Sequence, residues 1–150
     1  MIQHIDVHAV LQESVSGIYT DLVTRPTGRV VRERIEHAMA TAHGAVALAR
    51  IDFTRVGCID YSCADEIVAK LLRGRPAVLV LTGISDGHRE AIEPVLQGHG
   101  LAAACERPDG TLDAIGPREV ALALLEDLVA RHLATRTPAG ASPAAPFSSA

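Results

Sequence analysis

The feature of this sequence that most limits its fold is an uninterrupted apolar run, Ala77 to Leu81, which follows Pro76. Such a run is typical of a strand that other elements cover on both faces. Helical patterns stand on either side of it, over residues 62–74 and 85–97. Strands that alternate with helices in this way predict an α/β fold, with a mixed β-sheet and helices packed on it.

The first third of the chain is predicted to add three strands and one helix. Alternating apolar residues over 5–11 predict a half-buried strand, and residues 18–24 are interpreted as a second strand. A helix is expected between Gly28 and His43, because apolar residues recur there at helical spacing. The run of small apolar residues over 45–53 predicts a central strand.

The two helices around the apolar run carry start signals. Ser62 and Asp65 have the spacing of a capping box and predict that the first helix begins at Ser62. Ser85 or Asp86 is expected to cap the second helix. Pro94 falls inside that second helix and would remove a backbone hydrogen bond, so a kink or two short helices are expected.

The C-terminal part is predicted to hold a hairpin and an extra helix. Residues 101–105 and 111–115 read as two strands around a Pro-Asp-Gly turn. Pro117 then opens a helix whose apolar stripe includes Val120, Leu124, Leu128 and Val129. Residues 1–136 are expected to form a single domain. Residues 137–150, rich in Pro, Ala and Ser, are expected to be a flexible tail.

Composition excludes several classes of function. The formal net charge is −4 and aromatic residues make up 3% of the 150 residues, whereas nucleic-acid binders need a basic surplus and stacking rings. The three cysteines form no closely spaced pair, so no metal site is predicted. No other cofactor is expected either. No signal peptide and no membrane span is recognised, which predicts a cytoplasmic protein.

The segment after Phe53 is the strongest candidate for a functional site. Val56 and Ile59 are expected to enter the core, which leaves the turn Asp60–Ser62 at the N-terminus of a helix. Free amide groups and the helix dipole favour negative charge at such a position. A phosphate on a side chain there would be well placed, or would repel the nearby aspartates and block a docking surface.

The residues around this turn resemble the STAS domain, the family of sulphate transporters and anti-sigma-factor antagonists. The resemblance lies in the pattern Val-Ala-Leu-Ala-Arg-Ile-Asp-Phe-x-x-Val-x-x-Ile-Asp-x-Ser over residues 46–62. Ala-Asp-Glu at 64–66 and Thr-Arg-x-x-Gly-x-x-Val at 24–31 are similar to a divergent, STAS-like bacterial branch. The resemblance covers about residues 4 to 116 of this sequence.

The resemblance implies a phosphorylation-gated, protein-binding regulatory module. Asp60 matches the family's turn aspartate, Tyr61 occupies the usual phosphoserine position, Ser62 matches the second serine, and Cys63 replaces a glycine. Either Ser62 (or Tyr61) is the acceptor, or this branch does not switch in this way. The implied partner is a serine kinase that acts as an anti-sigma factor, or a sensor kinase.

The sequence thus predicts a partner-binding surface and no catalytic residue. Three alternatives stay open: Ser62 serves only as a helix cap, the same strand ends bind a small molecule or nucleotide, or the helix after Pro117 forms a homodimer. No nucleophile and base lie together in the sequence, which argues against an enzyme. The predicted surface consists of Asp60, Tyr61, Ser62, Cys63, Glu66, Ser85, Asp86 and His88.

Overall fold

The computed structural model describes residues 2–42, 48–74, 78–137 and 140–143. The strands in this part of the chain are β1 (Ile2–Asp6), β2 (Leu48–Asp52), β3 (Val78–Thr82), β4 (Ala103–Glu106), β5 (Leu112–Ile115), β6 (Ala134–Thr137) and β7 (Gly140–Pro143). The helices are α1 (Val7–Ser14), α2 (Arg25–Ala40), α3 (Tyr61–Ala64), α4 (Lys70–Gly74), α5 (Asp86–His99) and α6 (Arg118–Ala130), with a π-helical turn, η1 (Asp65–Ala69), between α3 and α4.

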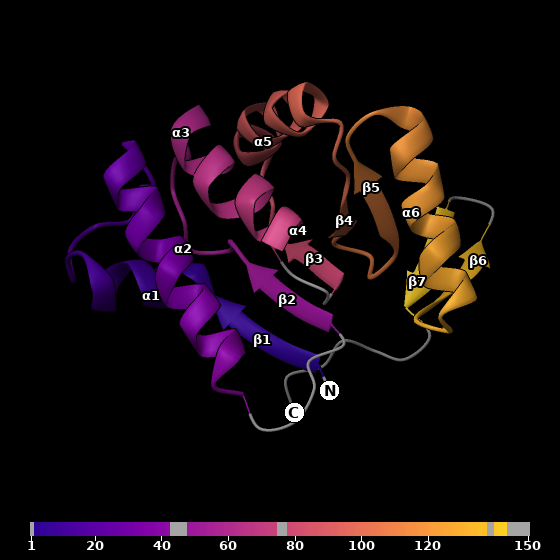
Figure 1. Cartoon of the computed structure of the whole chain (residues 1–150), viewed down its shortest axis with the longest axis horizontal. Helices are drawn as coiled ribbons and strands as arrows, with labels where there is room; N and C mark the ends of the chain where they lie inside the picture. The colour runs from indigo at the N-terminus through magenta and orange to yellow at the C-terminus, as the bar shows by residue number, and fades with distance from the viewer. Residues whose placement is uncertain (1, 43–47, 75–77, 138–139, 144–150) are drawn as a thin grey trace.

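The strands form one mixed sheet in the order β1-β2-β3-β4-β5-β7-β6. Strands β1 to β4 are parallel and follow the chain order, whereas β5, β7 and β6 add antiparallel pairs. Figure 1 shows α1 to α5 grouped on one side of the molecule and α6 alongside β5, β7 and β6. The predicted α/β class with a mixed sheet and an extra C-terminal helix is confirmed at this level.

The sheet separates two apolar cores. Ile51 and Leu79 point into the larger core, together with the apolar faces of α1, α2 and α5. Leu48 and Val80 point the other way and share the smaller core with Leu128 of α6. All five residues of β3 are buried, which confirms the covered strand predicted from its apolar run; Ala77 lies outside the described residues.

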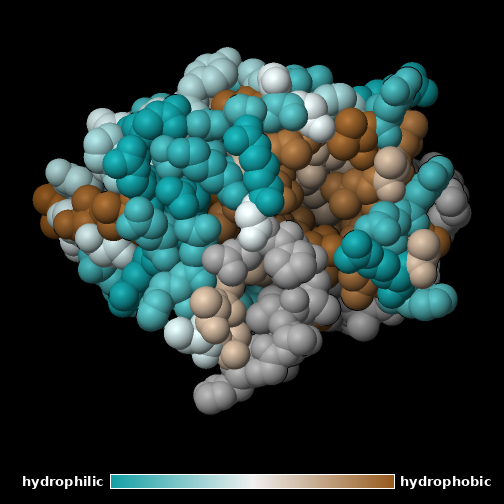
Figure 2. Space-filling model, viewed as in Figure 1, coloured by the Kyte–Doolittle hydropathy of each residue, from teal (hydrophilic) through white to brown (hydrophobic). Residues whose placement is uncertain are grey.

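The surface divides in the same way. Figure 2 shows polar side chains over most of the half that holds α1 to α5. Apolar atoms gather in a hollow toward the α6 side of the same face (Figure 2).

The two strands predicted before α2 are largely wrong. The first ends at Asp6, whose carboxylate accepts a 3.2 Å hydrogen bond from the amide of Ala9 and starts α1. Val7 and Leu11, four residues apart, are both buried, so the same apolar residues serve a helical face. Residues 18–24 form no strand; Leu22 alone makes an isolated bridge, and Ile18 is 84% exposed.

The predicted helix between Gly28 and His43 begins earlier than expected. It starts at Arg25, with Pro26 in its first turn, and it ends at Ala40. His43-Gly44, expected to end this helix, and residues 45–47, expected to begin the next strand, lie outside the described residues.

The later elements follow the prediction more closely. Ser85 caps α5, and α5 continues through Pro94 to His99, so the two short helices offered as one alternative are wrong. Strands β4 and β5 form the expected hairpin. Helix α6 follows Pro117 and buries Leu128 on the sheet, although Val120 of the predicted stripe is 38% exposed.

The predicted boundary at residue 136 is too early. Strands β6 and β7 pair with each other, and Ala141 of β7 pairs with Leu112 of β5. Ala134 and Ala141 are buried in the smaller core because of this pairing. The sheet therefore includes residues 140–143 of the predicted tail; residues 144–150 lie outside the described residues.

Candidate functional site

The segment that leads from β2 to α3 is held in place by the loop before α2. Val56 and Ile59 are buried, as the sequence predicted. The amide of Leu22 donates to the carbonyl of Cys58 at 2.8 Å, and the carbonyl of Leu22 accepts from the amide of Asp60 at 3.0 Å. These two bonds fix the position at which α3 starts.

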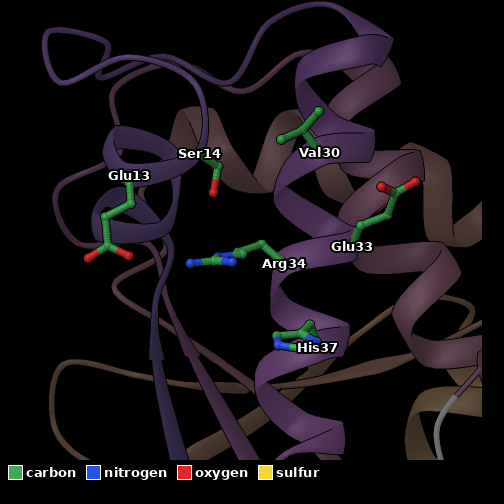
Figure 3. Close-up of a pocket in the computed structure, with 6 residues that line it drawn as sticks. All are labelled: Glu13, Ser14, Val30, Glu33, Arg34 and His37. Carbon is green, nitrogen blue, oxygen red and sulfur yellow. The ribbon is translucent and has the colours of Figure 1, made fainter.

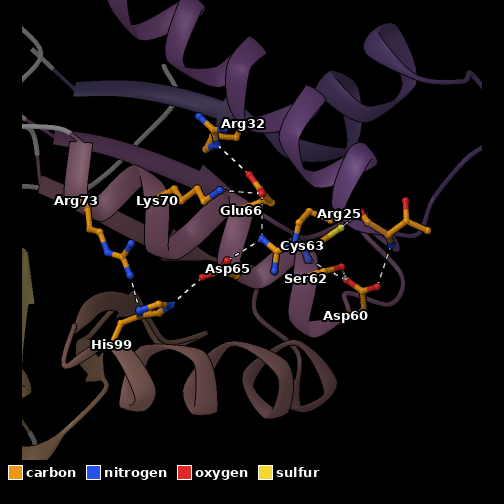
Figure 4. Close-up of polar contacts among 11 residues, drawn as sticks. Arg25, Arg32, Asp60, Ser62, Cys63, Asp65, Glu66, Lys70, Arg73 and His99 are labelled. Atoms are coloured by element: carbon orange, nitrogen blue, oxygen red, sulfur yellow. Dashed lines mark hydrogen bonds and ion pairs between the residues drawn. The ribbon is translucent and has the colours of Figure 1, made fainter.

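Asp60 caps the N-terminus of α3. Its Oδ1 accepts 2.8 Å hydrogen bonds from the amide of Cys63 and from the hydroxyl of Ser62 (Figure 4). Its Oδ2 accepts a 2.9 Å bond from the amide of Thr24. Burial alone would raise the pKa of Asp60, but these bonds outweigh it and lower the pKa. The ionised carboxylate therefore ties the start of α2 to the start of α3.

The predicted capping box of Ser62 and Asp65 is wrong. The helix begins at Tyr61, so Ser62 is its second residue, and Ser62 donates its hydroxyl to Asp60 instead of accepting from the backbone. Asp60, which directly precedes Tyr61, has the extended backbone of a capping residue. The helix itself extends to Gly74 as predicted, with the π-helical turn in its middle.

Cys63 lies inside the protein and not on its surface. The thiol is buried, and its Sγ donates to the carbonyl of Thr24 at 3.1 Å. Burial, followed by the nearby charge of Asp60, raises the pKa of Cys63 to about 12. The predicted place of Cys63 in an exposed partner surface is therefore wrong.

Glu66 is also buried, with none of its surface exposed, and it binds three cationic side chains (Figure 4). Its Oε1 lies 2.9 Å from Nη1 of Arg25 and 2.8 Å from Nζ of Lys70. Its Oε2 lies 3.3 Å from Nε of Arg32. Burial alone would raise the pKa of Glu66, but the three cations outweigh it and lower the pKa. Glu66 therefore joins α2 to η1 and α4 and does not belong to the exposed surface.

Asp65 extends this network to α5. It accepts from Arg25 at 2.8 Å, and its Oδ1 lies 2.8 Å from Nε2 of His99. The other ring nitrogen of His99 contacts the guanidinium of Arg73 (Figure 4). Burial would raise the pKa of Asp65, but Arg25 and His99 outweigh it and lower the pKa.

A groove of about 500 Å³ opens beside the predicted turn. Tyr61 is 61% exposed at its edge, and Ser62 is half-buried. The second half of α5 provides the opposite side, which sequence reasoning missed. Pro94 and Gly98 are four residues apart, and this helical spacing is the signal that could have placed them on one face. The groove is lined by Arg25, Tyr61, Ser62, Asp65, Pro94, Val95, Gly98 and His99.

The predicted surface residues at the start of α5 differ in exposure. Ser85 and Asp86 are exposed, but neither lines the groove. His88 is buried and closes a capping box with Ser85: its Nδ1 accepts from the Ser85 amide at 3.0 Å. Its Nε2 donates to the carbonyl of Gly57 at 2.7 Å. His88 therefore holds the segment after β2 against α5, and its predicted exposure is wrong.

The site is thus an ordered turn beside a groove. Within the described ranges, no group of three or more His, Cys, Asp or Glu side chains could hold a metal ion, and no helix is long and apolar enough to cross a membrane. Comparison of the chain with protein-family models, curated proteins and solved structures finds no match.

Proposed function

We propose that this chain is a cytoplasmic regulatory domain that acts by binding another protein, in the manner of the STAS-like anti-sigma-factor antagonists that its sequence resembles. The observation that carries the proposal is the position of Tyr61. It is the first residue of α3, it is 61% exposed, and it stands at the edge of the groove. Large aromatic side chains on a rigid surface are frequent anchors of protein interfaces.

The rigidity of the turn supports this proposal. Asp60, the residue before Tyr61, binds Ser62 and Cys63 after it and also the amide of Thr24. The backbone that presents Tyr61 is therefore ordered before any partner binds, which reduces the entropy lost on binding. The proposed contact surface consists of Asp60, Tyr61, Ser62, Pro94, Gly98 and His99.

Phosphorylation at the turn would change this surface. The Ser62 hydroxyl donates to Asp60, so a phosphate on Ser62 would remove that bond and place two negative groups side by side. Tyr61 is the more exposed acceptor, and a phosphate there would add charge at the edge of the groove. Both modifications are proposed to weaken binding of a protein kinase or anti-sigma-factor partner.

The test is a pull-down from the native cytoplasm with the wild type and with the variants Tyr61→Ala and Ser62→Asp. Tyr19→Ala is the matched control, because Tyr19 is also an exposed tyrosine, at 49%, and does not line the groove. The expected result is a partner that is lost with Tyr61→Ala and Ser62→Asp and kept with Tyr19→Ala. An identical set of bound proteins for all four chains, or none for any, would contradict the proposal.

A second candidate function rests on a cavity of about 300 Å³ at the carboxyl ends of β2, β3 and β4. Ligands of α/β proteins often bind outside these strand ends. Arg50 lines the cavity and forms an ion pair with Glu106 on β4, with Nε and Oε2 3.0 Å apart. A thermal-shift screen with nucleotides tests a small-molecule role, because a ligand raises the melting temperature by mass action. The cavity is lined by Arg50, Thr54, Thr82, Gly83, Ile84, Glu106, Arg107 and Pro108.

A further inference from the structure

A separate groove of about 450 Å³ lies where α1 packs beside α2 (Figure 3). None of its residues belongs to the proposed partner surface. Five of the six lining side chains are polar or charged, and the sixth, Val30, is 41% exposed. The lining residues are Glu13, Ser14, Val30, Glu33, Arg34 and His37.

Two donors in this groove have no acceptor among the residues that the structure describes. Figure 3 shows the guanidinium of Arg34 extended from α2 toward α1, with the hydroxyl of Ser14 pointing in its direction. Arg34 has no ion-pair or hydrogen-bond partner within the described part of the chain. The Ser14 hydroxyl oxygen is buried and likewise has no partner there. A buried polar atom without a partner is unfavourable, so the Ser14 hydroxyl favours an acceptor between the helices, and the exposed Arg34 guanidinium points toward the same place.

Two acids of the same groove are also unpaired. Neither Glu13 nor Glu33 binds a cation among the described residues. In Figure 3 the carboxylate of Glu33 lies on the other side of α2 from the guanidinium of Arg34. The groove therefore presents unpaired charges of both signs that do not neutralise each other. This pattern matches a ligand that itself carries both signs and disfavours a simple dianion.

We propose that the groove between α1 and α2 binds a free α-amino acid with an apolar side chain. The ligand's carboxylate accepts hydrogen bonds from the Arg34 guanidinium and the Ser14 hydroxyl, its ammonium group faces the carboxylate of Glu13 on α1, and its side chain covers Val30. A guanidinium is well suited to a carboxylate because its N–H groups match the two oxygens. The groove lies within the range of known small-molecule sites, about 300–1,000 Å³.

The test uses three matched probes and amide NMR shifts of the intact chain. L-Leucine carries both charges, 4-methylpentanoate lacks the ammonium group, and 3-methylbutylamine lacks the carboxylate. The expected result is saturable shifts at the amides of residues 13–14 and 30–37 with leucine. Each of the other two probes should bind about tenfold more weakly or worse, since each loses charge-assisted hydrogen bonds.

The variants test whether the shifts come from this groove. Arg34→Gln and Ser14→Ala should each weaken leucine binding, Arg34→Gln by about tenfold or more. Arg29→Gln is the matched control, because Arg29 is an exposed arginine on the same helix that does not line the groove. The proposal is overturned if leucine gives no saturable shift, if the three probes bind equally, or if Arg34→Gln binds leucine like Arg29→Gln. Because Arg34 is exposed and pairs with no described residue, its replacement is expected to leave the fold intact.

Discussion

The guanidinium of Arg25 lies 2.9 Å from the carboxylate of Glu66, and this ion pair joins the first turn of α2 to the π-helical turn η1. Arg25 is half-exposed, whereas Glu66 is fully buried. The pair therefore connects the surface at the candidate groove to the interior beneath it. A carboxylate in this position is expected to stay ionised, because it is the shared partner of three cationic side chains.

We predict that Glu66→Gln lowers the free energy of unfolding by about 2 to 3 kcal/mol at neutral pH, because three cations lose their shared partner. The pKa of Glu66 is lowered in the folded state. Its contribution is therefore present above the ordinary glutamate value of about 4.3 and is lost as the pH falls through the lowered value. Urea unfolding between neutral pH and the acid range should show the wild type converging on Glu66→Gln. Glu90→Gln, at an exposed glutamate of α5, should leave the difference from wild type near zero at every pH.

We predict that Asp60→Ala costs more stability than Ser62→Ala. Asp60 accepts from the amides of Cys63 and Thr24, and their loss should cost about 2 kcal/mol. Ser62 provides only a hydroxyl donor, so Ser62→Ala should cost about 0.5 to 1 kcal/mol. Chemical denaturation of both variants measures the difference. If Ser62→Ala were the more destabilising, Ser62 and not Asp60 would be the cap of α3.

The errors of the sequence analysis have a common physical origin. A strand and a helix can both use the apolar residues of the 5–11 segment, and the choice depends on Asp6 capping the Ala9 amide. The extra strands β6 and β7 consist of small and polar residues. They pair with each other, and β7 also pairs with β5, which a local pattern does not reveal. The covered strand β3 was predictable because its apolar run has a single explanation.

The candidate site was predicted in part for a similar reason. The turn at Asp60 and Tyr61 could be placed at a helix N-terminus from local residues alone. The burial of Cys63 and Glu66 could not, because it depends on α2 lying across them through Gly28 and Arg25. The same holds for the groove, whose second side comes from α5.

Gly28 is predicted to be required for the close approach of α2 to α3. A Cβ at this position would lie 3.0 Å from Cα of Cys63 and 3.1 Å from Cβ of Glu66. Gly28→Ala should therefore lower the free energy of unfolding by about 1 to 3 kcal/mol, although alanine is the better helix former. Gly98→Ala is the control: it also lies in a helix but has open space around it, and should raise stability by about 0.5 to 1 kcal/mol. Thermal melts that shift in the same direction for both variants would contradict the close-packing argument.

The three cysteines are predicted to differ sharply in their reaction with iodoacetamide. Cys58 is exposed, whereas Cys63 and Cys105 are buried. Burial raises the pKa of Cys63 to about 12 and also raises the pKa of Cys105, so little thiolate forms at either position near neutral pH. Mass spectrometry after alkylation of the native chain should find one modified site, at Cys58, and three after unfolding in urea. Cys58→Ser should give no modified site in the native chain. Alkylation of native Cys63 at the rate of Cys58 would show that α3 opens from α2 and that the site is not preordered.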